Sequence, residues 1–162
     1  MTYTEEHKNE KMTAKDWNDV DASSRLLAKM WLSQNEFFDV KESEGCCCYD
    51  LLASRIVNGT KKTYAIECKN RSADKYDKFK DVMVEMIKLD SLKARKAKGE
   101  FNGIILINTY TNSNIVRYAN GCKEPDEVKC FRCPKWSYVK GVDSRSEDKS
   151  CALFKQFNES VI

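Results

Sequence analysis

The sequence predicts a single α/β domain in which helices flank a mixed sheet of four to five strands, in the order α-β-β-β-α-β-β. Three observations predict this fold class. Apolar residues first recur at helical spacing, the pattern then changes to strands joined by an Asn-Gly turn, and a later run, 104–107, is apolar on both faces. We expect a flexible arm over residues 1–15 and the domain over residues 16–162.

Periodicity places the elements along the chain. Trp17, Val20 and Leu27 share one face of an expected helix at 16–34, and a second apolar stripe predicts a long helix from Tyr76 to Gly99. From Cys122 on, the chain is expected to be mostly irregular. Strands are expected over residues 37–40, 46–57, 63–69, 104–107, 115–118 and 136–139.

Composition excludes several classes of protein. Hydrophobic residues make up 41% and charged residues 33% of the 162 residues, with 6 Gly and 2 Pro, which excludes collagen-like, low-complexity and wholly disordered chains. No apolar run reaches the length of a membrane span, and the polar N-terminus lacks the apolar core of a signal peptide. We therefore expect a cytoplasmic protein without a membrane partner.

The net charge of +3 conceals an uneven distribution. Residues 61–100 contain 12 basic and 7 acidic side chains, whereas residues 1–60 contain 7 basic and 11 acidic ones. A basic block of this kind is either the solvated face of a helix or the side of a nucleic-acid site that faces phosphates.

The Asn58-Gly59 turn fixes which residues of its two strands face each other. Both turn residues accept positive φ, as a two-residue hairpin requires, and facing residues then have numbers that total 117. Asp50 therefore faces Glu67 on a neighbouring strand, and Lys69 points to the same face because strand side chains alternate. Two facing carboxylates repel, so we expect a cation between them.

This group of residues has the chemistry of a hydrolytic site. Mg²⁺ or Mn²⁺ binds one or two carboxylates with waters and phosphate oxygens, and here Asp50, Glu67 and the backbone carbonyl of Cys68 would hold it. Lys69 would orient the attacking water or stabilise charge that develops at phosphorus. These residues predict phosphodiester hydrolysis.

The motif Tyr49-Asp50-Leu51-Leu52, followed by Ala65-Ile66-Glu67-Cys68-Lys69, resembles the PD-(D/E)XK nuclease superfamily. The resemblance covers residues 16–118 and implies a restriction-endonuclease-like or junction-resolvase-like core and a small DNA endonuclease of a phage, mobile element or bacterium. It also implies the catalytic role of Asp50, Glu67 and Lys69. Many members carry a Glu on the first helix, where this chain has none, and Asp21 is its nearest substitute.

The residues after the motif are candidates for contacts with the phosphates of duplex or branched DNA. They are Asn70, Arg71, Lys75 and Lys78. Symmetric cleavage of two strands would suit a homodimer. Two other functions stay open: a catalytically incomplete nucleic-acid-binding protein of the same fold, and a zinc-binding interaction module.

The zinc hypothesis depends on the C-terminal cysteines. Cys130 and Cys133 have the spacing of a ligand pair, and Cys122 and Cys151 are the other candidates for a structural zinc site. Buried, inert thiols are the simpler interpretation of the same residues.

Overall fold

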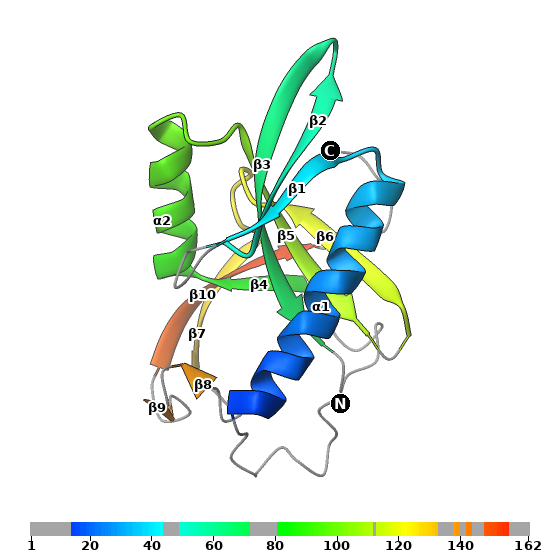
Figure 1. Ribbon diagram of the computed structural model, residues 1–162. Coiled ribbons are helices and arrows are strands. Elements are labelled where there is room, and N and C mark those ends of the chain that lie inside the picture. The colour runs from blue at the N-terminus through cyan, green and yellow to red at the C-terminus, as the bar shows by residue number, and fades with distance from the viewer. Residues whose placement is uncertain are drawn as a thin grey trace.

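The computed structural model describes residues 14–43, 49–71, 81–111, 113–132, 138–139, 142–143 and 148–155 (Figure 1). Its helices are α1 (Ala14–Gln34) and α2 (Met86–Ala97). Its strands are β1 (Phe38–Glu42), β2 (Leu51–Val57), β3 (Thr60–Asn70), β4 (Asp81–Glu85), β5 (Gly103–Tyr110), β6 (Ile115–Asn120), β7 (Glu127–Arg132), β8 (Tyr138–Val139), β9 (Val142–Asp143) and β10 (Asp148–Lys155).

The central element is a five-stranded mixed sheet in the order β1-β2-β3-β5-β6. β3 and β5 run parallel, and the other neighbours are antiparallel. All eight residues of β5 are buried, as its unbroken apolar run predicted. The predicted α/β class, with a sheet of four to five strands flanked by helices, is confirmed.

Different partners cover the two faces of the sheet, and α1 and α2 lie on opposite sides of it (Figure 1). Ala28 and Leu32 of α1 pack against one face, where Ile66 of β3 and Ile107 of β5 belong to the same buried cluster. A second cluster lies on the other face. It contains Ala65 of β3 and Leu106 of β5 together with Val82, Val84, Leu89, Leu92, Ala152 and Phe154 from β4, α2 and β10.

The long helix expected from Tyr76 to Gly99 was wrong in part. Residues 81–85 form strand β4, and helix α2 begins only at Met86; residues 76–80 lie outside the described part of the chain. Val82 and Val84 alternate with exposed or half-buried neighbours, which is the strand period, and β4 pairs with β10, whose residues 151–155 are far away in sequence.

The expectation of irregular structure after Cys122 was also wrong. β7 and β10 pair antiparallel, and β4 joins them in a three-stranded sheet of order β4-β10-β7. This small sheet packs with α2 on the central sheet through the second cluster. It therefore forms part of the cover over the face on which Glu67 lies.

The remaining element predictions hold within the described residues. α1 begins two residues before the predicted helix and ends at the predicted Gln34, and β1, β3 and β6 overlap the predicted strands. Residues 46–48 of the second predicted strand lie outside the described part of the chain. Neither helix described is long and apolar enough to cross a membrane.

Candidate functional site

The hairpin of β2 and β3 has the register that its turn predicts. Leu51 pairs with Ile66 and Val57 with Thr60, and the turn residues Asn58 and Gly59 have φ values of 50° and 78°. The printed pairs end at Leu51 and Ile66, and the N–H of Asp50, just before β2, donates to the carbonyl of the same Ile66 at 2.8 Å. The register that the turn predicts therefore holds from Leu51 to Val57, Asp50 lies beside Ile66 at the strand end, and the pairing of Asp50 with Glu67 stays a prediction.

Alternation along β3 assigns these side chains to the face that α2 covers. Ile66 belongs to the cluster under α1, and Ala65 belongs to the cluster on the opposite face. Because successive strand residues point to opposite faces, Glu67 and Lys69 share the face of Ala65. The candidate site therefore lies between the central sheet and the first turn of α2.

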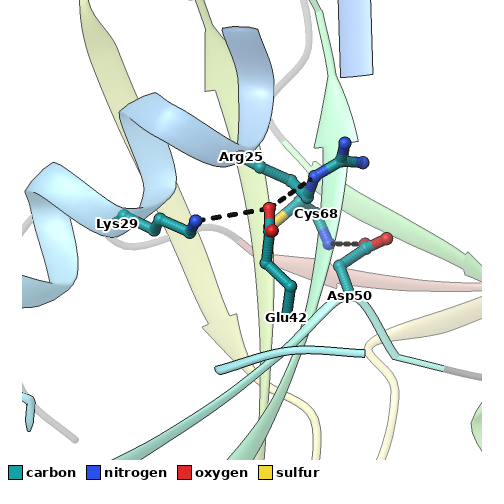
Figure 2. Close-up of polar contacts among 5 residues, drawn as sticks. All are labelled: Arg25, Lys29, Glu42, Asp50 and Cys68. Atoms are coloured by element: carbon teal, nitrogen blue, oxygen red, sulfur yellow. Dashed lines mark hydrogen bonds and ion pairs between the residues drawn. The ribbon is translucent and has the colours of Figure 1, made fainter. Parts of the chain in front are cut away.

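Asp50 also fixes the backbone of β3. Its Oδ2 accepts a hydrogen bond from the N–H of Cys68 at 2.7 Å (Figure 2). In a strand, the N–H and C=O of one residue point to the same edge, so the carbonyl of Cys68 also lies on the edge next to Asp50. The Asp50 carboxylate thus lies beside the backbone of Cys68 at the end of β2, and its charge acts on Glu67.

Glu67 forms an ion pair with Lys88, a lysine of the basic block of residues 61–100. Lys88 Nζ lies 2.7 Å from Glu67 Oε1, and their side chains are 38% and 17% exposed. Burial, and secondarily the negative charge of Asp50, raises the pKa of Glu67 from 4.5 to about 7, while Lys88 acts in the opposite direction. Burial lowers the pKa of Lys88, but the Glu67 carboxylate outweighs it, so this pKa is raised.

Lys69 is buried on the same face, near charges of both signs. Burial, followed by the charge of Arg71, lowers the pKa of Lys69, and Glu85 opposes that shift. Glu85 also raises the pKa of Lys88. The site therefore contains two lysines from different elements, and Glu85 at the start of α2 acts on both.

The donor set fits a hard divalent cation. Carboxylate and carbonyl oxygens are the ligands of Mg²⁺, which takes its remaining ligands from water and phosphate. The ammonium of Lys88 already acts as a cation beside Glu67, so this position accommodates positive charge. Among the described side chains, no group of three or more His, Cys, Asp or Glu residues is placed to hold a metal, so the proposed set combines two carboxylates with the Cys68 carbonyl.

Lys88 and Glu85 were missed by the sequence analysis. Lys88 belongs to the basic block of residues 61–100, which was a usable signal, but the expected long helix gave no reason to direct it towards β3. The strand β4 and the start of α2 at Met86 place Lys88 in the first turn, beside Glu67. Lys88 and Glu85 therefore belong to the candidate site because residues 81–85 form a strand and α2 begins at Met86.

The predicted phosphate contacts are described only in part. Asn70 is the last residue of β3, and the N–H of Arg71 donates to the carbonyl of Thr109 at 2.8 Å, so both follow directly on Lys69. Lys75 and Lys78 lie outside the described residues.

The side chain of Asp21 also lies outside the described part of the structure. The backbone of Asp21 is part of α1, and the buried apolar side chains described in this helix, Ala28 and Leu32, pack on the face opposite Glu67. Ser24 of α1 bonds Thr109 of β5, and Thr109 in turn bonds the carbonyl of Lys69. At the end of β1, Arg25 and Lys29 form ion pairs with Glu42, at 3.0 and 3.3 Å (Figure 2).

The candidate zinc ligands do not converge where they are described. Cys130 pairs with Ser150, and Cys151 pairs with Lys129, so the two thiols are one position out of register and point to opposite faces of the small sheet. Cys151 is buried, whereas Cys122 and Cys130 are exposed. Because Cys133 lies outside the described residues, the zinc site stays a prediction.

Comparison with known proteins gives one structural likeness. No protein-family model and no curated protein matches the sequence. Among solved structures, the chain is similar to D212, a nuclease from a fusselovirus, with a TM-score of 0.39 and 9% sequence identity over 85% of this chain and 80% of that one. A likeness of this size carries no argument about the function of the chain.

Proposed function

We propose that this chain is a metal-dependent nuclease that hydrolyses phosphodiester bonds of DNA, with Asp50, Glu67 and Lys69 as its catalytic residues. The observation that carries the proposal is the nearness of two carboxylates, with Asp50 bonded to the backbone of Cys68 and its charge acting on Glu67, and with lysines beside them. Facing carboxylates destabilise a sheet unless a cation lies between them, and phosphodiester hydrolysis uses such a cation.

Each residue has a defined task in this proposal. Asp50, Glu67 and the Cys68 carbonyl would hold Mg²⁺ or Mn²⁺, which when bound makes water more acidic and neutralises phosphate charge. Lys69 would donate hydrogen bonds to the oxygens on which negative charge accumulates. Asn70 and Arg71 follow Lys69 along the chain and would contact neighbouring phosphates of duplex or branched DNA.

Two hydrogen bonds to the backbone of β3 hold the residues of the proposed site in place. The bond from Cys68 N–H to Asp50 Oδ2 holds the first carboxylate against β3, and the bond from Thr109 to the carbonyl of Lys69 ties the next residues to β5. Such preorganisation lowers the reorganisation that the transition state requires.

A second candidate function has one specific observation in its favour. The ion pair of Lys88 with Glu67 neutralises a carboxylate that the metal would need. A protein in which this pair is permanent would bind nucleic acid without cleaving it.

One assay distinguishes the two candidate functions. Plasmid and branched DNA are incubated with Mg²⁺ or Mn²⁺ and the wild-type protein, or with Glu67→Gln or Lys69→Met variants. We expect each variant to lose at least about a hundredfold in cleavage rate, as is typical when one charge-stabilising group is removed, and to remain folded by circular dichroism.

The chain contains a matched control for the Glu-x-Lys motif. Glu127 and Lys129 on β7 have the same spacing and form an exposed ion pair at 3.4 Å. Glu127→Gln and Lys129→Met should keep the wild-type cleavage rate. DNA binding without cleavage by the wild-type protein would favour the second candidate, and equal cleavage by all variants would refute the site.

A further inference from the structure

The ammonium of Lys88 lies where the proposed metal needs room. Lys88 comes from the first turn of α2, and Glu67 comes from β3, yet Nζ and Oε1 are 2.7 Å apart. Glu67, Asp50 and Glu85 all act on Lys88 with negative charge. Lys88 is therefore the lysine that bonds Glu67 directly, whereas Lys69 acts on Glu67 only through its charge.

Lys88 and a divalent cation cannot both contact Glu67 at low cost. An ammonium and a metal ion on one carboxylate would lie only a few ångströms apart, and like charges at such distances repel strongly in a partly buried site. The side chain of Lys88 is 38% exposed, and its stem of four methylene groups rotates freely, so it can leave Glu67 without unfolding α2.

Building on the proposed function, we propose that Lys88 is an internal counter-ion that competes with the divalent metal for Glu67 and thereby regulates metal binding. Metal binding displaces the Lys88 ammonium from Glu67. The displaced ammonium is then free to bind a phosphate group of the nucleic acid, so metal and nucleic acid bind cooperatively. The free protein consequently has a lower metal affinity than its donor set alone would give.

Metal binding itself provides the test. Mn²⁺ binding is measured by electron paramagnetic resonance at about pH 8.5, well above the folded pKa of Glu67. We expect Lys88→Met to bind Mn²⁺ about tenfold more tightly than the wild type, which corresponds to about 1.4 kcal/mol. Lys88→Arg keeps the positive charge and should bind Mn²⁺ as the wild type does.

Two controls complete the experiment. Lys93→Met removes a charge from the same helix and should leave the affinity unchanged, whereas Lys88→Met combined with Glu67→Gln should lose the gain. Wild-type or weaker Mn²⁺ affinity of Lys88→Met would overturn the proposal. DNA cleavage is not read in this assay, so a protein that binds Mn²⁺ as expected but cleaves no DNA would contradict the proposed function alone.

A measurement on the wild-type protein covers the case in which the variant does not fold. Lysines are acylated with an N-hydroxysuccinimide ester, with and without Mn²⁺, and each site is quantified by mass spectrometry. Mn²⁺ should increase the labelling rate of Lys88 severalfold and leave that of Lys93 unchanged. Labelling of Lys88 that is the same or slower with Mn²⁺ would also overturn the proposal.

Discussion

Replacement of Glu67 by glutamine is expected to change how the stability of the metal-free protein depends on pH. The pKa of Glu67 is about 7 in the folded protein against an ordinary 4.5, chiefly because the carboxyl group is buried. A carboxyl group whose pKa rises on folding binds more protons in the folded state between these two values. The free energy of unfolding therefore falls as the pH rises from about 4.5 to about 7.

The size of this effect follows from the shift. A change of 2.5 pKa units at about 1.36 kcal/mol per unit sets an upper limit of about 3 kcal/mol. Between about pH 5 and pH 8, partial titration at both ends leaves about 2.5 kcal/mol. The glutamine side chain of the Glu67→Gln variant has no charge at either pH, so the variant lacks this loss of stability.

Urea unfolding followed by circular dichroism, in the presence of a metal chelator, measures the difference. The unfolding free energy of Glu67→Gln minus that of the wild type should increase by about 2.5 kcal/mol from pH 5 to pH 8. Glu127→Gln, in an exposed ion pair on β7, is the matched control for the loss of one carboxylate. A difference for Glu67→Gln that is the same at both pH values would refute the conclusion that burial raises the pKa of this carboxyl group to about 7.

Two further predictions concern the sheet that supports the site. Leu106→Ala, in the fully covered strand β5, should lower the free energy of unfolding by about 2–5 kcal/mol, measured by urea unfolding, because it opens a cavity under the second cluster. Gly103→Ala should destabilise the protein by about 1–3 kcal/mol, because a Cβ there would lie 2.5 Å from Cδ1 of Tyr64; a rise in thermal midpoint would contradict this packing.

The core of the candidate site follows from local sequence. A two-residue turn at Asn58-Gly59 allows one register for the strands that it joins, so the pairing from Val57 with Thr60 to Leu51 with Ile66 needs no information from the rest of the chain. The same holds for β5, whose apolar residues on both faces require cover on both sides.

Tertiary structure decided what lies over this hairpin. The segment 81–85 has valines at alternate positions but also fits an apolar helical stripe, and only pairing with β10 makes it a strand. β10 and β7 themselves could not be found from the sequence, because a small sheet depends on contacts between distant segments.

The position of Lys88 beside Glu67 likewise depends on contacts between segments that are distant in sequence. The sequence shows a lysine in a basic block, and the charge alone does not distinguish a solvated residue from a partner of Glu67. Because strand β4 ends at Glu85, α2 begins at Met86, and its first turn lies beside β3. The sequence thus determined the register of the β2–β3 hairpin through a turn of two residues, whereas the counter-ion of Glu67 came from long-range packing that periodicity does not encode.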